Sequence, residues 1–307
     1  MNSSPRMLEK FMRRLELDDI DKSALSKQFS FFLEEEVGRN NLGSPLNGDL
    51  TTKVCQINSK GKAKLVAREN IIVCGLALVP LLFESFGLKK LEFETNASDG
   101  DEIRSGTEFA RIQGFGNQIL LIERTMLNII QRLSGIASKT KRFVRLASPY
   151  GVHFLDTRKT TPGLRQLEKY ATACGGGKNH RLRLDGQILI KDNHLASKGI
   201  RSPIQLEDFL KKIRENQPNE LIEVEIDDLE QLKAAMKSGI DAILLDNFEP
   251  ERVHEAVQIN QNKCILEASG GINESTIEKY ARAKPHFISS GAPIHASRWL
   301  DIGLDWY

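Results

Sequence analysis

The chain has 307 residues, of which 40% are apolar and 27% are charged, and its formal net charge is +2 at pH 7. These values are typical of a soluble globular protein with one large domain or two ordinary ones, and they give no overall basis for binding nucleic acid or a membrane. The four cysteines are far apart and form no CxxC pair, which favours a reducing compartment and free thiols over disulfides or a structural zinc site.

The sequence gives no sign of export or of a membrane span. Its beginning lacks the apolar core of a secretory signal peptide. The longest apolar run, residues 71–83, contains Gly75 and Pro80 and is too short to cross a bilayer. We therefore expect a cytoplasmic protein.

The first third of the chain contains predicted helices and short strands. Residues 5–36 carry apolar side chains at helical spacings, and the Gly, Asn and Pro content of residues 38–49 indicates a loop. Short strands are expected at 63–68, 91–96 and 108–113, with turn residues between the last two. We predict that residues 1–134 form an α+β, sandwich-like domain of antiparallel strands and helices.

The strongest predicted helix covers residues 117–136. It is apolar around most of its circumference, so other parts of the protein, or a second subunit, should cover both of its sides. Glu123 and Arg124 interrupt the apolar pattern, and an unpaired buried charge is costly. Each therefore needs a partner. Because adjacent residues on a helix do not face each other, we expect a buried Arg124 to need an anion from outside the helix, although a structural pair with Glu123 stays open.

From residue 152 onward, short apolar strands alternate with helical stretches. Repeated strand–helix units imply a parallel sheet, and their spacing predicts a barrel of six or seven strands rather than eight. We therefore expect an α/β protein in which residues 135–307 form an incomplete βα barrel. The predicted strands are 152–155, 188–191, 221–226, 242–245, 265–268 and 287–289, and the predicted helices are 162–173, 204–215, 229–238, 250–260 and 274–283.

Polar residues gather where the predicted barrel strands end. The carboxyl ends of barrel strands share one face, where ligands bind, so six polar clusters at these ends together indicate a site. The clusters are 156–159, 191–194, Glu225, 246–247, Glu267 with 269–271, and 290–291.

The segment 156–194 is unusually basic. It holds eight Lys or Arg against four Asp or Glu, a formal +4, while the rest of the chain sums to −2. This concentration around Gly and Thr predicts a site for a compact polyanion rather than a solvated helix face. The basic side chains suit a ligand with two or more carboxylates, and those singled out are Arg158, Lys159, His180, Arg181 and Lys191.

Two further groups of residues complete the expected site. Glu225 and Asp246 lie at the ends of successive strands, and carboxylate oxygens of this kind suit Mg²⁺. Residues 269–271 and 290–291 are Ser and Gly before predicted helices, where backbone N–H groups bind phosphate. The sequence therefore predicts a dicarboxylate, a magnesium ion and a phosphate in one cleft.

Several motifs in this segment match one family in order. Residues 156–194 contain DTRKT, PGLR, LEKYA, GGG, NHR and LIKDNH, and from about residue 120 to the C-terminus the chain closely resembles the quinolinate phosphoribosyltransferase family. The resemblance implies that quinolinate and phosphoribosyl pyrophosphate react to give nicotinate mononucleotide, pyrophosphate and CO₂ in NAD biosynthesis, with Mg²⁺. It also implies a homodimer, or a larger assembly, with shared active sites.

The resemblance assigns roles to individual residues. Arg124 would come from the neighbouring subunit, and Glu225 and Asp246 would hold the metal. The residues implied to contact quinolinate are Arg124, Thr157, Arg158, His180, Arg181 and Lys191.

The other substrate has its own implied set. Lys159, Lys191, Glu225 and Asp246 would be catalytic. The residues implied to bind phosphoribosyl pyrophosphate are Lys159, Glu225, Asp246, Ser269, Gly270, Gly271, Ser290, Gly291 and His295.

The chain departs from the family pattern in two places. Arg183 stands where the family commonly has glycine and Asp185 appears one position early, while the loop 38–49 is lengthened. Two other interpretations stay open, namely a paralogous phosphoribosyltransferase acting on another anionic ring and a catalytically silent sugar-phosphate-binding protein. The intact LIKDNH motif and the full basic set favour quinolinate, and retention of both Glu225 and Asp246 argues against a silent receptor.

Overall fold

A computed structural model describes residues 5–307 of the chain, which divide into two compact units. The barrel unit comprises residues 5–14 of the described chain, Thr140–Thr160 and Gly177–Ala296. The sheet unit comprises Leu15–Lys139, Thr161–Gly176 and Ser297–Tyr307. The two units are interleaved along the sequence, so each draws residues from both sides of the boundary predicted at residue 134.

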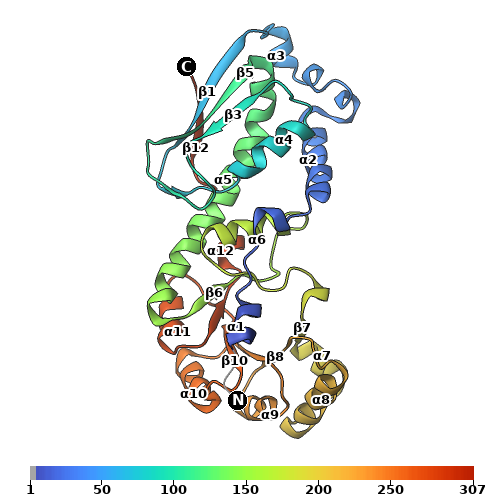
Figure 1. Cartoon of the computed structure of the whole chain (residues 1–307), viewed down its shortest axis with the longest axis vertical. Helices are drawn as coiled ribbons and strands as arrows, with labels where there is room; N and C mark the ends of the chain where they lie inside the picture. The colour runs from blue at the N-terminus through green and yellow to red at the C-terminus, as the bar shows by residue number, and fades with distance from the viewer. Residues whose placement is uncertain (1–4) are drawn as a thin grey trace. The chain divides into compact units, whose positions relative to one another are not determined.

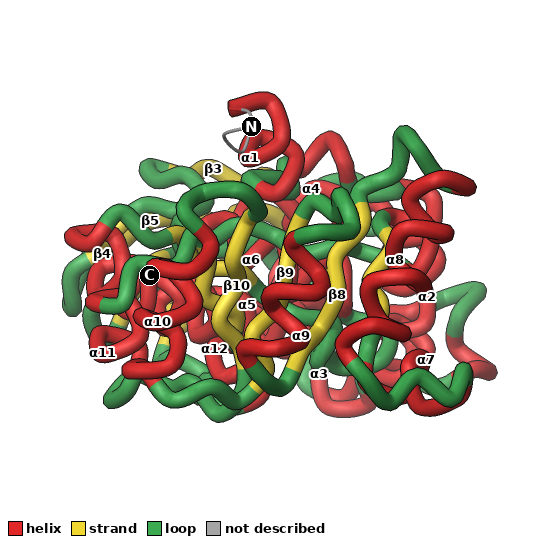
Figure 2. Tube along the Cα trace, turned by 90° about the horizontal axis from the view of Figure 1, so that it is seen from below, coloured by secondary structure: helices red, strands yellow, loops and turns green. Residues whose placement is uncertain are grey.

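The barrel unit is built on six parallel strands, and Figure 2 shows β8, β9 and β10 side by side. Their order in the sheet is β6-β11-β10-β9-β8-β7, and a single parallel bridge from Leu155 to Lys178 lies beside β6. The predicted incomplete βα barrel is therefore confirmed. The strands are β6 (His153–Leu155), β7 (Ile188–Ile190), β8 (Ile222–Ile226), β9 (Ala242–Asp246), β10 (Ile265–Ser269) and β11 (Phe287–Ser289).

Helices follow the strands as the sequence predicts, and α8, α9 and α10 lie outside the strands in Figures 1 and 2. The starts of α8 and α9 are marked by capping residues, because the side chains of Ser202 and Asp228 accept backbone N–H groups of the first turn. The helices of this unit are α1 (Pro5–Phe11), α7 (Asp192–Ser197), α8 (Pro203–Asn216), α9 (Leu229–Met236), α10 (Pro250–Asn260), α11 (Ile277–Arg282) and α12 (Ala292–His295).

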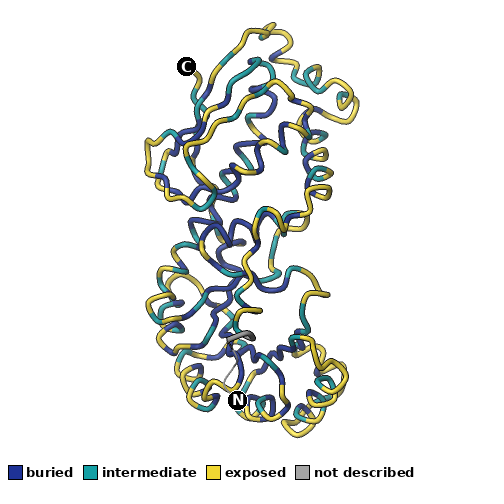
Figure 3. The backbone as a smooth tube through the Cα atoms, in the orientation of Figure 1, coloured by how far each residue is buried: buried dark blue, intermediate teal, exposed yellow. Residues whose placement is uncertain are grey.

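Alternate side chains of the barrel strands face opposite sides of the sheet. In β8, Ile222, Val224 and Ile226 belong to the buried core that the strands share with the outer helices. Glu223 and Glu225 point to the other side, the interior of the barrel, and both are buried. Figure 3 shows the strands buried and the outer faces of the helices exposed. Carboxylates at inward positions of a buried parallel strand are unusual and indicate a functional interior.

The short helix α1 closes the amino end of the barrel. Its Phe11 packs in a small buried cluster with Ala242, Ile265 and Phe287, which begin β9, β10 and β11. The ring centroids of Phe11 and Phe287 are 6.1 Å apart. Because α1 covers this end, the carboxyl ends of the strands are left for ligands.

Replacing Phe11 with alanine should destabilise the barrel unit. Phe11 is only 5% exposed, and deleting a buried phenylalanine ring costs about 3–5 kcal/mol. Hydrogen exchange of the β9 and β10 amides should accelerate accordingly. Phe31, which is 64% exposed, provides the matched control, since Phe31→Ala should leave this exchange unchanged. Unaltered protection in Phe11→Ala would mean that α1 does not support the barrel.

The acid stability of the barrel unit should depend on His286. Nδ1 of His286 accepts the backbone N–H of Leu266 at 3.0 Å, and burial, with the charge of His153, lowers the pKa of the imidazole. The unfolded chain therefore binds a proton near the ordinary pKa of about 6.5 before the folded chain does, and stability falls as the pH drops from about 7 to 5. In His286→Asn an amide oxygen can replace Nδ1 as acceptor. The urea midpoints of unfolding at about pH 7 and pH 5 should therefore lie closer together in this variant than in the wild-type protein. An unchanged pH dependence in the variant would exclude His286 as the cause.

The sheet unit contains an antiparallel sheet of order β12-β1-β5-β3. The three predicted strands of this region are confirmed as β1, β3 and β5, but β12, from the C-terminal end of the chain, was not anticipated. Its Ile302 pairs with Ala67, and its Trp306 pairs with Ala63. The strands of the unit are β1 (Lys60–Ala67), β2 (Ile71–Ile72), β3 (Glu92–Thr95), β4 (Glu102–Ile103), β5 (Glu108–Phe115) and β12 (Ile302–Trp306).

The helices before the first strand differ from the prediction. Instead of one helical region over 5–36, α1 ends at Phe11 and α2 begins at Lys22, because Asp21 caps α2 by accepting the N–H groups of Ser23 and Ala24 at 3.0 Å. The predicted loop 38–49 contains two short 3₁₀ turns, Arg39–Asn41 and Pro45–Asn47. The helices of the unit are α2 (Lys22–Val37), α3 (Leu50–Val54), α4 (Val79–Ser85), α5 (Gly116–Ala147, whose last residues from Thr140 belong to the barrel unit) and α6 (Arg165–Cys174).

Helix α5 confirms the strongest helical prediction and continues eleven residues beyond it, to Ala147. Between Gly116 and Thr140 every residue is at least partly buried except Arg124. The single chain therefore covers this part of the helix by itself, and the expectation that Arg124 is buried is wrong. Within residues 5–307, no helix combines the length and the hydropathy needed to span a membrane.

Candidate active site

The predicted acidic and basic residues meet at the carboxyl ends of the barrel strands. Lys191, directly after β7, forms an ion pair with the carboxylate of Glu225, near the end of β8. Asp246 ends β9 and lies in register with Ser269, the last residue of β10. The register of parallel strands thus places these four side chains along one edge.

Two glycines bring further predicted residues close together. A Cβ atom on Gly291 would lie 3.2 Å from Cβ of Lys159 and 3.0 Å from the ring of His295, so these two residues meet across the glycine. Gly270 has φ +97° and packs against Asn247, whose amide in turn donates to Asp246 at 2.7 Å. Larger residues at either glycine would push the loops apart.

The carboxylates at this edge repel one another. Burial and then the charge of Glu225 raise the pKa of Asp246, although Lys191 and Lys159 oppose the shift. Burial and the charges of Asp192 and Glu225 likewise raise the pKa of Asp227. A hard divalent cation would relieve this repulsion, so the donor set at Glu225 and Asp246 fits Mg²⁺.

Two neighbouring guanidinium groups form the centre of the basic set. The Nε atoms of Arg158 and Arg181 are both buried, and neither has a hydrogen-bond partner among the described residues. Burial and then the charge of Arg158 lower the pKa of Arg181, which shows that the two cations repel each other. An anion with two carboxylates would supply both missing acceptors and neutralise both charges.

The NHR motif is attached to the end of β6. Asp156, which is 1% exposed, accepts the backbone N–H of His180 at 2.9 Å and the side-chain amide of Asn179 at 2.7 Å. This pairing holds the DTRKT and NHR motifs together, although Asp156 and Asn179 are 23 positions apart in the sequence. Thr157 lies at the same strand end, where its hydroxyl accepts the N–H of Lys159 at 3.0 Å.

His180 lies deeper in the barrel than the sequence indicates. Its Nε2 is 3.2 Å from Glu223 and 3.5 Å from Glu267, so its charge is matched by the protein itself. Burial opposes protonation, but the charges of Glu267 and Glu223 outweigh it and raise the pKa of His180 to about 10. Nδ1 accepts the N–H of Arg181 at 2.9 Å, which instead favours a single ring proton. In either state Nε2 donates towards the glutamates.

Sequence reasoning missed two of the residues around His180, namely Glu223 and Gln187. It also placed Glu267 too near the end of its strand. Burial and then the charge of Glu267 raise the pKa of Glu223 to about 7. Gln187 donates to Glu223 at 2.9 Å. The only sequence signal was the glutamate at an inward position of β8, alternating with Ile222 and Val224.

The expected phosphate region differs from the prediction in its helices. The helix after Gly270 and Gly271 begins only at Ile277, and α12 after Gly291 has four residues, so neither supplies a strong helix dipole at the glycines. Gly270 and Gly271 have positive φ values of +97° and +61°. Backbone N–H groups of these turns, rather than helix ends, are the donors available to a phosphate.

The side-chain hydroxyls of Ser269 and Ser290, the two serines of this region, form hydrogen bonds within the protein. The hydroxyl of Ser290 donates to the carbonyl of Ile272 at 2.6 Å and accepts the N–H of Ala292 at 3.1 Å. The hydroxyl of Ser269 accepts from Ser289 at 2.9 Å. Both side chains therefore shape the loops around the glycines.

Two remaining predictions concern residues at the surface. Arg124, on α5 of the sheet unit, is exposed. The unusual loop residues Arg183 and Asp185 form an exposed ion pair with a 3.1 Å separation and leave the contact from Arg181 to the carbonyl of Gln187 intact at 2.8 Å. The departure from the family pattern therefore changes the surface of the loop.

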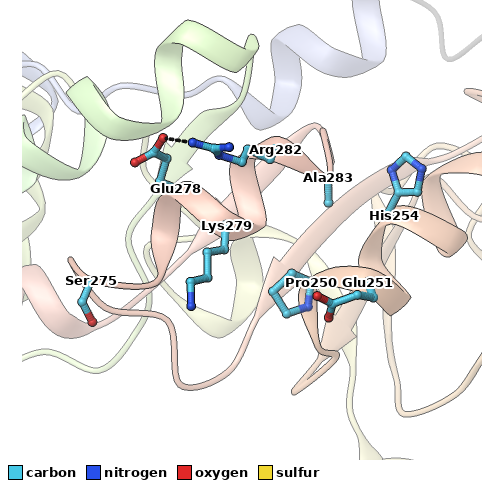
Figure 4. Close-up of a pocket in the computed structure, with 8 residues that line it drawn as sticks. All are labelled: Pro250, Glu251, His254, Ser275, Glu278, Lys279, Arg282 and Ala283. Carbon is cyan, nitrogen blue, oxygen red and sulfur yellow. Dashed lines mark hydrogen bonds and ion pairs between the residues drawn. The ribbon is translucent and has the colours of Figure 1, made fainter.

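The barrel unit also has a groove away from these strand ends. A cavity of about 680 Å³ lies between α10 and α11 and contains none of the predicted site residues (Figure 4). Its charged side chains partly neutralise one another, as in the ion pair of Arg282 with Glu278 at 2.8 Å. The groove therefore offers no concentrated field for an anionic substrate.

Models of one family match most of the chain, from residue 49 to residue 305. The N-terminal domain of quinolinate phosphoribosyl transferase matches residues 49–134, and the C-terminal domain of the same family matches residues 136–305. A probable nicotinate-nucleotide pyrophosphorylase [carboxylating] from Synechocystis is 36% identical over 277 residues, 89% of each chain. Its counterpart from Methanocaldococcus jannaschii is 38% identical over 269 residues, covering 84% of this chain and 91% of the relative.

Solved structures agree with these matches. The nicotinate-nucleotide pyrophosphorylase from Francisella tularensis superposes with a TM-score of 0.85 at 32% identity, covering 94% of this chain and 98% of that one. The enzyme from Ehrlichia chaffeensis gives 0.84 at 34% identity, covering 94% and 99%. With both family domains matched in order and the DTRKT, NHR and LIKDNH motifs gathered at one end of the barrel, this chain belongs to the quinolinate phosphoribosyltransferase family.

Proposed function

We propose that the chain transfers the phosphoribosyl group of phosphoribosyl pyrophosphate to quinolinate and releases CO₂, forming nicotinate mononucleotide for NAD biosynthesis. The observation that carries this proposal is the pair Arg158 and Arg181, whose buried Nε atoms lack acceptors. A ring with two adjacent carboxylates supplies both. Relatives named quinolinate phosphoribosyltransferase [decarboxylating], such as the Nicotiana tabacum protein at 34% identity, support the same substrate.

The reaction needs orientation and charge stabilisation more than proton abstraction. The pyridine nitrogen attacks the anomeric carbon, and the bond to pyrophosphate breaks with its electron pair going to the leaving oxygen. The carboxylate at C2 then leaves as CO₂, and the electron pair that remains on C2 takes up a proton. Fixed carboxylates of Glu225 and Asp246 stabilise the cationic anomeric carbon, and the arginines hold the ring in line for attack.

The two substrates use different parts of the site. Arg158, Arg181 and Lys191 bind quinolinate together with Thr157 and His180. Phosphoribosyl pyrophosphate lies on the other side, where the residues proposed to bind it are Lys159, Glu225, Asp246, Ser269, Gly270, Gly271, Ser290, Gly291 and His295. Of these, the serines act by shaping the glycine turns, as their hydroxyl contacts indicate.

A magnesium ion and a second subunit complete the proposal. Glu225 and Asp246 would hold Mg²⁺, which neutralises negative charge on the departing pyrophosphate when bound. The exposed Arg124 would enter the quinolinate site of a second copy in a cytoplasmic homodimer. Its position as the one exposed residue between Gly116 and Thr140 supports this role.

The test is a product assay. Purified protein incubated with quinolinate, phosphoribosyl pyrophosphate and Mg²⁺ should release pyrophosphate and CO₂ in equal amounts. Nicotinate, which lacks the second carboxylate, should give neither product at a comparable rate. The absence of both products with quinolinate would contradict the proposed function. Activity on another anionic ring alone would favour a paralogous transferase.

A further inference from the structure

A closed ring of contacts joins four residues, which are His180, Glu223, Gln187 and Arg181. Nε2 of His180 lies 3.2 Å from Oε2 of Glu223, and the amide of Gln187 donates to the same oxygen at 2.9 Å. The backbone carbonyl of Gln187 accepts Nη1 of Arg181 at 2.8 Å. The backbone N–H of Arg181 donates to Nδ1 of His180 at 2.9 Å. The orientations of His180 and Arg181 therefore depend on Gln187 and Glu223.

Glu267 faces the same imidazole from another strand and acts on it through its charge, since neither of its oxygens has a hydrogen-bond partner among the described residues. Its Oε2 is 3.5 Å from Nε2 of His180, and it is 1% exposed, while Glu223 is fully buried. Burying charged groups is unfavourable even when they are paired, and an apolar residue at these inward positions of β8 and β10 would avoid that cost. Both carboxylates are therefore better explained by the site than by stability.

We propose that Gln187, Glu223 and Glu267 are positioning residues that orient His180 and Arg181 for a ligand with two carboxylates. This inference rests on the proposed function. Among residues 5–307, Gln187 and Glu223 make no hydrogen bond or ion pair with Lys159, Gly270 or Gly291, whereas Glu267 interacts with Ser289, which precedes the turn at Gly291. Loss of Gln187 or Glu223 should therefore weaken binding of the dicarboxylate and spare binding of phosphoribosyl pyrophosphate.

A metal ion is the competing explanation for this cluster. The ligand atoms of His180, Glu223 and Glu267 all lie within 4.8 Å of one another. However, Oε2 of Glu223 already faces two nitrogen donors, from His180 and Gln187, whose hydrogens occupy the space that a cation at this oxygen would need. Oε1 of Glu223 and both oxygens of Glu267 have no hydrogen-bond partner among the described residues, so a measured metal content separates the two explanations. The contacts at Oε2 favour a hydrogen-bonded clamp.

Gln187→Leu is the first test, because it removes the amide donor at similar volume from a half-buried position. The KM for quinolinate should rise on the order of tenfold, as for a lost hydrogen bond to a charged group, with a smaller fall in kcat. The KM for phosphoribosyl pyrophosphate should stay within about twofold. Gln258→Leu, at an exposed position of α10, is the matched control and should change neither constant.

Glu267→Gln is the second test, since it keeps the shape and removes the charge. In ¹⁵N-histidine spectra the wild-type protein should show a hydrogen-bonded Nε2 proton of His180, identified by its absence in His180→Gln. This signal should broaden or disappear in Glu267→Gln. If that variant fails to fold, the kinetics of Gln187→Leu still decide the question.

Three outcomes would overturn the proposal that Gln187, Glu223 and Glu267 position His180 and Arg181. The first is an equal rise in the KM values of both substrates, and the second is an unchanged KM for quinolinate in folded variants. The third is a stoichiometric metal ion in the wild-type protein that is lost in Glu267→Gln. A separate result tests the function itself. If calorimetry detects no quinolinate binding to the wild-type protein, the proposed function fails, while the His180 spectra still report on the clamp.

Discussion

Replacing Arg158 with alanine is expected to raise the KM for quinolinate by roughly 10- to 150-fold while leaving the KM for phosphoribosyl pyrophosphate nearly unchanged. The Nε of Arg158 is buried without an acceptor, and its charge acts on Arg181. A bound carboxylate therefore gains charge-assisted hydrogen bonds worth about 1.5–3 kcal/mol. Since about 1.4 kcal/mol is tenfold, the stated range follows. Steady-state kinetics with each substrate varied in turn measure it.

Two further variants make this result specific. Arg158→Lys keeps the charge but loses the planar fork, so it should fall between wild type and Arg158→Ala. Arg183→Ala serves as the control, because Arg183 is exposed and its ion-pair partner Asp185 is exposed too. If Arg158→Ala weakens both substrates equally, the arginine supports the loop and does not recognise the dicarboxylate.

Arg124→Ala and Lys191→Ala should each be nearly inactive, but a mixture of the two should recover roughly a quarter of wild-type activity. In a homodimer with shared sites, the mixed dimer has one site that combines the intact Lys191 of one subunit with the intact Arg124 of the other. Random mixing makes half of the dimers mixed. The remaining site in each mixed dimer lacks both groups, which gives the expected quarter of active sites.

The mixing experiment needs co-refolding and a count of heterodimers, for which differently tagged subunits suffice. Mixing Arg158→Ala with Lys191→Ala is the control, because both residues belong to the barrel unit of one chain and no intact site can form. Verified heterodimers without recovered activity would mean that Arg124 serves its own subunit or only the fold.

The barrel could be predicted because its strands and helices are short, local and regular. Strands β8, β9 and β10 are short segments rich in Ile, Leu and Val that are followed by amphipathic helices, and the structure moves their ends by only a residue or so. Strand β12 could not be predicted, since Trp306 pairs with Ala63 more than 240 positions away and no local pattern records such a partner. The break before α2 was missed because apolar spacing was given more weight than the cap at Asp21.

The site was predictable where residues lie at strand ends and less so where they lie inside the barrel. Glu225 and Asp246 follow from their places near the ends of two successive predicted strands. Gln187 could not be found, because its role depends on the opposing carboxylate of Glu223 on the next strand. The exposure of Arg124 also escaped prediction, since an apolar helix pattern does not reveal which of its polar residues faces water.

Helix α1 makes the order of synthesis important for this protein. Phe11 leaves the ribosome before its aromatic partner Phe287, which follows 276 residues later (287 minus 11). At roughly 5–20 residues per second, this interval lasts about 14–55 s. Throughout that time the apolar face of α1 has no completed barrel to cover. In the nascent chain this face is therefore either exposed to solvent or bound by a chaperone. Translation that stops before β11 would leave the apolar face of α1 permanently uncovered, which makes such truncated chains prone to aggregation.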